Sequence, residues 1–435
     1  MPEAQLNSYA ESLTIPEALL PVERDWEYTK EKTGLQENDI VICYPVRSGI
    51  GKFVGALAET SAHELGTKIV SALLERTGRG DIRDRVDTLI AGQVIQDGMN
   101  PAGQIKTYAG VRETATAYTI NMACGSGLKA VLNAASAIRD RENTGVKLAI
   151  AGGFENMSRA PSLLESNRKG FGLGGQIFRD GVLNSLTDAF EGVHMGVTAE
   201  RLAALPGKPK ITRADADRYA LRSQHRAELA RQADYFKDSI VPIEVLQDRK
   251  MVVFQDDEAV RGNKATLEGL ARTKPAFQED GIVTAGNASG ISDGAAFMIV
   301  TTARKAEELG LEISLRLVAA AEAGVAPGLM GLGPIPASRK ALGRAGLKMA
   351  DIDDFELNEA FANVALVCGQ ALEATDDQLN PLGGAIAHGH PIGATGGVLV
   401  SKIASFLGHN PDSRYGMASL CIGGGQGIAA IFEKV

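Results

Sequence analysis

The chain has 435 residues, of which 44% are hydrophobic and 23% are charged. This length exceeds one compact core, so we expect two or three domains or one large duplicated unit. The formal net charge is -8 and no long basic run is present, which argues against non-specific nucleic-acid binding. No apolar run reaches the roughly 18 residues that span a bilayer, and no targeting segment is recognisable, so a cytoplasmic protein is expected.

The first predicted part is a polar N-terminal extension, residues 1–37, to which we assign no function. From 38 to 158, strand-like segments such as DIVICYPVR alternate with helical ones such as GSGLKAVLNAASAIRD. This alternation indicates a parallel α/β sheet.

A change in composition separates residues 159–285 from the segments on either side. Charged residues and glycine-rich loops predict an inserted domain over the α/β core, with a charged helix at 212–236. The α/β pattern resumes at 286–305, which completes the first half, and fills a second half at 306–435. Two halves of similar length suggest an internal duplication.

Cys124 follows a predicted strand in TINMACGSGLKAV, and the Gly-Ser-Gly after it begins a helix. A helix N-terminus favours the thiolate form, so Cys124 is a candidate nucleophile; the alternative is a buried structural cysteine. The chain has four cysteines without CxxC spacing, which indicates a reducing compartment. The other two, Cys43 and Cys368, are predicted core residues.

Two further segments place reactive side chains at strand ends. Cys421 precedes a triple-glycine turn in SLCIGGGQG, where exposed amides beside a thiol could bind an oxyanion, although a structural role is favoured for this cysteine alone. Asn358, in FELNEAFANV, could cap a helix, hold a water or orient a carbonyl. Glu359 could be a simple charge in the first helical turn.

The segment GGAIAHGHPIGATGG, residues 383–397, holds two of the six histidines. It lacks the lysine of a P-loop and the acidic partner of a Rossmann fingerprint. No carboxylate lies near the histidines in sequence, so no metal site is expected. What is left is a histidine presented on a tight turn by glycine and proline.

The blocks NMACGSGLKAV, NEAFA, GGAIAHGHPIGATGG and CIGGGQG, in this order, resemble the signature blocks of the thiolase family. HMGVTAE, VTAGNASGISDGAA and MGLGPIPASRKAL also match, and the resemblance covers residue 38 to the C-terminus. It implies two similar α/β halves stacked in an αβαβα arrangement, with an inserted loop domain.

The resemblance also implies roles for named residues. Cys124 would be the acyl-accepting nucleophile, His390 its base and Cys421 the second acid/base. Asn358 would hold a water that binds one thioester oxygen together with His390, and the main-chain amides of Cys124 and Gly423 would bind the other oxyanion. The predicted contacts to coenzyme A are Ser289, His194 and Arg261. Met195 and Met330 would restrict the acyl pocket, so acetyl-CoA and acetoacetyl-CoA are the expected substrates.

Coenzyme A is then substrate and product, with no permanently bound cofactor, and a homodimer or homotetramer is expected. The alternatives are a degradative 3-ketoacyl-CoA thiolase of broader chain length and an inactive subunit that binds CoA thioesters. If the segment around His388 is extended, alternation directs this residue away from His390. This predicts a structural or supporting role for His388, and His388→Leu is expected to keep most activity. The chain departs from the usual family pattern at Ser48, Gly49, Phe154, Asn156, Gly269 and His388.

Overall fold

The computed structural model describes residues 34–435, except 96, 97, 165–167, 169, 171, 172, 174, 206–209 and 248. The predicted extension at 1–37 therefore falls almost entirely outside the described residues. Within the described part of the chain, no helix is both long and apolar enough to cross a membrane.

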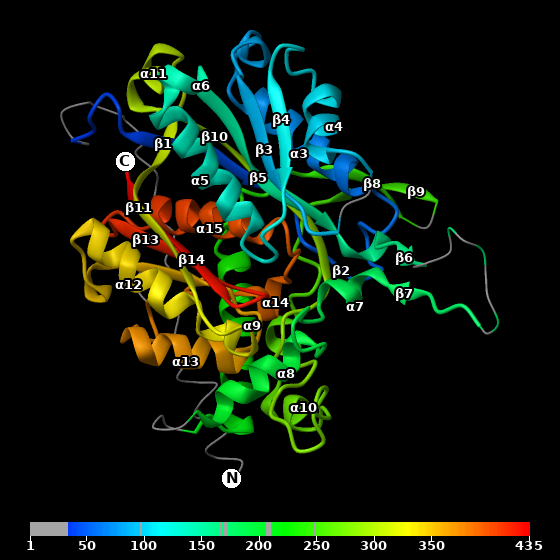
Figure 1. Ribbon diagram of the computed structural model, residues 1–435. Coiled ribbons are helices and arrows are strands. Elements are labelled where there is room, and N and C mark those ends of the chain that lie inside the picture. Colours follow the sequence, from blue (N-terminus) through cyan, green and yellow to red (C-terminus); the bar gives the residue numbers. More distant parts are fainter. Residues whose placement is uncertain are drawn as a thin grey trace.

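The first half contributes five strands in the order β4-β3-β5-β10-β1 (Figure 1). β3 is parallel to β4 and β5, whereas β10 is antiparallel to β5 and β1. The expectation of a parallel sheet is therefore wrong for the pairs that β10 makes with β5 and β1. The chain leaves the sheet at Asn156, the last residue of β5, and returns at β10, where Asp293 pairs with Asn156 in the antiparallel direction. The strands span Ile40–Arg47 (β1), Thr88–Gly92 (β3), Thr116–Ile120 (β4), Leu148–Asn156 (β5) and Ser292–Thr302 (β10), and the short β2, Gly51–Lys52, pairs with β10.

The second half repeats this order with β12-β13-β14-β11. An isolated bridge between Phe355 and Leu379 lies at the edge that β4 occupies in the first half. β1 and β11 pair antiparallel and join the halves into one mixed sheet. The strands span Ile313–Gly324 (β11), Asp354–Leu357 (β12), Tyr415–Ile422 (β13) and Gln426–Lys434 (β14).

Three apolar cores hold five layers together, because the middle core includes both faces of the central helices α5 and α15. This arrangement confirms the predicted αβαβα fold. Alternation along β5 shows how one strand serves two cores: Leu148 and Ile150 pack toward α3 and α4, while Ala149 and Ala151 pack toward α5 and α15. The third core lies between the second half of the sheet and α12 and α13. The helices span Ala62–Arg76 (α3), Pro101–Tyr108 (α4), Ser126–Arg139 (α5), Arg141–Thr144 (α6), Ala303–Glu308 (α11), Pro334–Ala345 (α12), Ala362–Leu372 (α13), Ala385–His388 (α14) and Thr395–His409 (α15).

The two central helices, α5 and α15, meet at glycines near their N-termini. A Cβ on Gly396 would lie 2.0 Å from the backbone nitrogen of Leu128, and one on Gly127 would lie 2.8 Å from the carbonyl oxygen of Gly393. Only glycine allows the helices to approach this closely. The contact brings together the turns that precede the two helices, and these turns carry Cys124 and His390.

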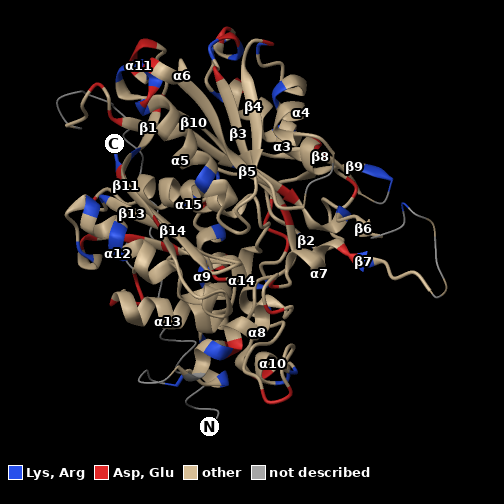
Figure 2. Cartoon of the chain, viewed as in Figure 1, with Lys and Arg blue, Asp and Glu red and all other residues tan. Residues whose placement is uncertain are grey.

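The segment between β5 and β10, which was predicted as the inserted domain, packs against the second half of the fold. Its long helix α9 begins with a capping box between Thr212 and Asp215 and packs on α13 and α14 of the second half. Figure 2 shows charged residues on outer helices such as α11 and α12, whereas the central strands carry few. The elements here span Ser162–Leu163 (β6), Arg179–Asp180 (β7), Gly181–Ser185 (α7), Met195–Glu200 (α8), Arg213–Gln232 (α9), Ile243–Gln247 (β8), Lys250–Phe254 (β9) and Leu267–Ala271 (α10).

Candidate functional site

A pocket of about 390 Å³ lies where the two halves and the inserted segment meet. Most of its lining is apolar, as is usual for a site that encloses a small organic ligand. Eight of the ten residues predicted for the site line it: Cys124, His194, Met195, Ser289, Met330, His390, Cys421 and Gly423. Asn358 reaches the pocket through His390, and Arg261 does not line it.

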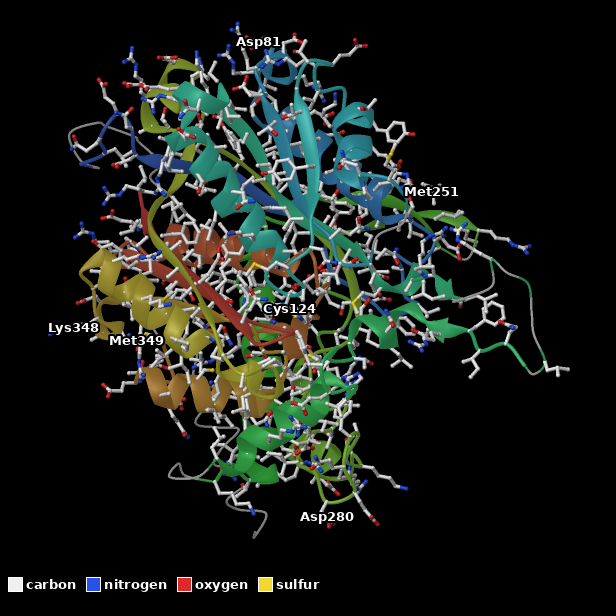
Figure 3. All side chains as sticks on the ribbon, viewed as in Figure 1. Asp81, Cys124, Met251, Asp280, Lys348 and Met349 are labelled. Carbon is white, nitrogen blue, oxygen red and sulfur yellow. The ribbon has the colours of Figure 1, made fainter. Side chains whose placement is uncertain are left out.

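Cys124 lies on a tight turn between β4 and α5, in the middle of the molecule (Figure 3). Ala123 has a φ of 42°, an uncommon conformation for a residue with a Cβ. Ser126 closes the turn, since its hydroxyl accepts from the amide of Met122 at 2.8 Å. The turn therefore presents a partly buried sulfur next to the start of a helix.

The environment of the Cys124 sulfur favours the neutral thiol. Burial raises its pKa to about 11, although hydrogen bonds from the amides of Gly423 and of Cys124 itself act in the opposite direction. The expectation that the helix N-terminus yields a thiolate is therefore wrong for the resting protein, because desolvation outweighs the amides. Cys124 needs a base to become nucleophilic.

His390 follows the short helix α14 and is buried in the pocket wall. Its Nδ1 lies 2.7 Å from the hydroxyl oxygen of Thr395. That hydroxyl donates to the carbonyl oxygen of Pro391 at 2.9 Å, so it must accept from the Nδ1–H of His390. The hydrogen-bond pattern therefore leaves Nε2 as the unprotonated nitrogen of the neutral ring.

Burial lowers the pKa of His390 to about 4. The ring is therefore neutral at physiological pH, and its Nε2 lone pair is available as a base. Together with the raised pKa of Cys124, this gives a resting pair of thiol and imidazole rather than thiolate and imidazolium.

Asn358 follows β12 and directs its side chain at His390. Its Nδ2 lies 3.4 Å from the Nε2 of His390, and its Oδ1 is buried with no hydrogen-bond partner among the described residues. It does not cap the following helix, because the N-cap of α13 is Phe361. A buried amide oxygen without a partner is suited to hold a water.

Cys421 lies at the end of β13 and is fully buried. Burial, followed by the nearby Cys124, raises its pKa well above the usual value. Gly424 and Gly425 turn the chain into β14 with positive φ, and the amide of Gly423 is thereby directed to Cys124. The triple glycine thus places a second thiol and an amide donor beside the nucleophile.

The residues predicted to contact coenzyme A differ in position. His194 stacks on Phe277 at 4.5 Å between ring centroids, and Ser289 donates to the carbonyl oxygen of Ala360 at 3.1 Å; both line the pocket. Met330 is buried and Met195 half-buried at the same pocket. Arg261 is exposed, and its backbone amide donates to Gln224.

His388 points away from His390, but not for the predicted reason. The segment is not extended there, because residues 385–388 form the helical turn α14, and Gly389 then reverses direction with a φ of 114°. The ring of His388 borders a different cavity, of about 330 Å³, between α9 and the residues after β9. Its contacts, to Asp257 and Leu382, are to groups outside the catalytic pocket.

Three buried side chains that fix the catalytic turn were not predicted as site residues. Glu155 accepts from the amides of Val94, Ile95 and Gly393, and burial raises its pKa to about 7. Glu359 is not a simple first-turn charge, because it is buried and accepts hydrogen bonds from Tyr219, Ser223, Asn380 and the amide of Ile386. Thr395, five residues after His390, could have been found from its spacing.

Comparisons with known proteins agree along most of the chain. Residues 40–304 match the family model "Thiolase, N-terminal domain" and residues 311–434 match "Thiolase, C-terminal domain". Acetyl-CoA acetyltransferase of Escherichia coli (strain K12) is 44% identical over 400 residues, which cover 91% of this chain and 99% of the relative.

Solved structures show the same likeness. The Bacillus anthracis acetyl-CoA acetyltransferase aligns with a TM-score of 0.87 at 39% identity, covering 92% of this chain and 99% of that one. Human mitochondrial 3-ketoacyl-CoA thiolase in complex with CoA aligns with a TM-score of 0.85 at 35% identity, covering 92% and 98%.

Proposed function

The chain belongs to the thiolase family, and we propose that it catalyses the reversible cleavage and formation of short-chain 3-ketoacyl-CoA through an acyl-cysteine intermediate. The observation that carries the proposal is the convergence of Cys124, His390, Cys421 and the amide of Gly423 on one apolar pocket. This chemistry requires a soft nucleophile, a neutral base, a second acid and a donor to the oxyanion. Cys124, His390, Cys421 and the amide of Gly423 supply these groups in that order.

In the first half-reaction, Nε2 of His390 takes the proton from the thiol of Cys124. The sulfur attacks the 3-keto carbon of acetoacetyl-CoA, and the amides of Cys124 and Gly423, which already face the sulfur, are placed to bind the resulting oxyanion. The bond between C2 and C3 then breaks, leaving an acetyl group on Cys124 and a carbanion at C2. Asn358, through a bound water, and the protonated His390 stabilise that carbanion as an enolate.

Cys421 completes this half-reaction by donating its thiol proton to C2, which releases acetyl-CoA. The raised pKa of Cys421 suits it to hold a proton until a strong base forms beside it. In the second half-reaction, the Cys421 thiolate takes the proton of the free CoA thiol, and the CoA sulfur attacks the acetyl-cysteine. A second acetyl-CoA leaves, and the Cys124 thiolate recovers its proton from His390. Condensation runs through the same steps in reverse.

The acyl group is proposed to be short. The apolar side chains nearest Cys124 include Met157, Leu186, Ile291 and Ile392, which pack with it in one small cluster. Met195 and Met330 close the neighbouring wall of the pocket. The whole pocket of about 390 Å³ must also take the pantetheine arm, which leaves little room for a long acyl chain.

The test is a thiolysis assay on 3-ketoacyl-CoA esters of increasing chain length, with Cys124→Ser and His390→Ala alongside. Fastest cleavage of acetoacetyl-CoA by the wild type, and loss of about 100- to 10,000-fold in both variants, is the expected result. Better cleavage of 3-ketooctanoyl-CoA would favour the degradative enzyme of broader range. No thiolysis of any ester would favour a subunit that only binds CoA thioesters.

We propose a cytoplasmic homodimer or homotetramer, in which coenzyme A enters and leaves as substrate and product. Light scattering on the eluting peak of a sizing column gives the assembly, and a monomer would contradict it.

A further inference from the structure

A buried ion-pair network lies behind the catalytic turn, outside the pocket. Arg47, at the end of β1, holds Asp257 of the inserted segment through two hydrogen bonds of 2.6 and 2.9 Å. Asp257 also lies 2.7 Å from Nδ1 of His388. The side chains of all three residues are at most 4% exposed. Three parts of the chain that are distant in sequence therefore meet in one network.

Both ring nitrogens of His388 face acceptors. Nδ1 faces the Asp257 carboxylate, and Nε2 lies 2.9 Å from the carbonyl oxygen of Leu382. His388 therefore bridges the two when both of its nitrogens carry a proton. Although burial opposes ionisation of Asp257, the charges of Arg47 and His388 hold the pKa of Asp257 well below its usual range.

A close backbone approach also brings the inserted segment to this network. A Cβ on Gly49 would lie 2.4 Å from the carbonyl oxygen of Asp256, so glycine allows the inserted segment to approach β1 closely. His388 supplies a side-chain contact between this segment and the catalytic turn. Phe236 packs against both Arg47 and His388. The centre of its ring lies 4.9 Å from the Arg47 guanidinium, and it meets the His388 ring edge-on at 5.4 Å between ring centroids.

The geometry around Gly389 transmits the position of His388 to His390. A Cβ on Gly389 would lie 2.4 Å from the hydroxyl oxygen of Ser292, which also accepts from the backbone amide of His390 at 3.2 Å. The peptide between the two histidines therefore has little room to shift on its own. We therefore expect a shift at the Leu382 end of the turn to displace His390 as well.

We propose that His388 is a positioning residue, which ties the catalytic turn to Asp257 and Arg47 and thereby holds His390 in place for proton transfer from Cys124. The inference rests on the proposed function, since it assumes that His390 is the base. A shift of 1 Å in a catalytic group can cost about 100-fold in rate, so partial release of the turn is expected to cost about tenfold.

The test is steady-state thiolysis of acetoacetyl-CoA by three variants of full-length protein. His388→Leu removes both bridging contacts, His388→Asn keeps a donor on the Nδ1 side, and His388→Gln keeps one on the Nε2 side. We expect kcat to fall about tenfold in His388→Leu with KM within about twofold of wild type. His388→Asn and His388→Gln should each retain more kcat than His388→Leu, because each keeps one of the two contacts, to Asp257 or to the carbonyl of Leu382.

A matched control is His409→Leu, which replaces another buried histidine at the far end of α15. It should lower the melting temperature at unchanged kcat. A wild-type kcat in His388→Leu would overturn the inference. If His388→Leu fails to fold, a wild-type kcat in both His388→Asn and His388→Gln would overturn it instead.

His390→Ala, measured in parallel, separates the two proposals. Loss of activity there with wild-type kcat in His388→Leu contradicts only the positioning role. Retained activity in His390→Ala contradicts the proposed function itself.

Discussion

The two catalytic turns occupy equivalent places in the duplicated fold, yet they are held in different ways. The turn that carries Cys124 is closed by its own residues: Asn121 accepts from the amide of Ala123, and Ser126 accepts from that of Met122. The turn that carries His390 has one local partner in Thr395 but is otherwise held by side chains from other parts of the chain. These are Glu155, Ser223, Asp257, Ser292 and Glu359.

This difference follows from what each turn has to do. A nucleophile at the start of a helix needs only a tight local turn to expose its sulfur. A base must keep a fixed distance and tautomer relative to a sulfur on the other half, so it is anchored to both halves and to the inserted segment. The His390 turn should therefore be sensitive to substitutions remote from it, whereas the Cys124 turn should not.

Glu359→Gln should have the largest effect among the remote anchors. The carboxylate accepts from two hydroxyls, one side-chain amide and one backbone amide, and an NH2 group in place of one oxygen would face donors. Leaving one or two of them unsatisfied costs about 1–3 kcal/mol each. Urea titration should show a free energy of unfolding lower by about 3 kcal/mol, and kcat should fall as well. Ser126→Ala, the local counterpart at the Cys124 turn, should lower the free energy of unfolding by only about 1 kcal/mol. A larger loss in Ser126→Ala than in Glu359→Gln would contradict the proposed difference between the two turns.

Gly396→Ala tests the contact between the two central helices. The added methyl would press on the backbone nitrogen of Leu128, which cannot move aside without shifting α5. Overpacking of this kind costs about 1–3 kcal/mol in unfolding free energy. Gly343→Ala is the control, because no atom lies within 4 Å of its added methyl in α12, and it should stabilise by about 0.5–1 kcal/mol. Equal effects at both sites would show that the central helices are not closely packed.

Thr395→Val should lower kcat about tenfold and lower the free energy of unfolding by about 1–3 kcal/mol, because buried groups at His390 and Pro391 lose their partner. The methyl that replaces the hydroxyl cannot accept from the Nδ1–H of His390, so the tautomer that leaves Nε2 free is no longer fixed. Thr395→Ser keeps the hydroxyl and should retain most of the activity. A Val variant as active as the Ser variant would mean that the threonine does not set the tautomer.

The smallest effect is expected from pH. Because the pKa of His390 is lowered to about 4, the base is neutral from about pH 5 upward and is lost only as pH falls through about 4. The kcat/KM for thiolysis should therefore be nearly flat between about pH 5.5 and 7.5. An acidic limb centred near the ordinary histidine value of about 6.5 would show that His390 is not desolvated in the working enzyme.

The sequence carried the local features of this site but not the long-range ones. Cys124, His390, Cys421 and Asn358 each lie in a short glycine-rich or strand-end segment whose chemistry can be interpreted alone. The αβαβα fold followed from the family resemblance. The mixed direction of the sheet did not, since the pairing of Asn156 with Asp293 spans the whole inserted segment.

The anchors of the catalytic turn could not be predicted for the same reason. Glu155 and Gly393 are 238 positions apart, and Asp257 and His388 are 131 apart. A buried carboxylate looks like any other acidic residue until its amide donors are known. The pKa of Cys124 was misjudged because the degree of burial around its sulfur depends on the tertiary structure.

The most direct test of the central claim is to trap the acyl group. Wild type, Cys124→Ser and Cys421→Ala would each be mixed with acetyl-CoA, quenched in acid, digested and analysed by mass spectrometry. One acetyl group on the peptide that contains Cys124 is predicted for the wild type and for Cys421→Ala, and none for Cys124→Ser. Acetyl on the peptide that contains Cys421, or on no peptide of the wild type, would contradict the account.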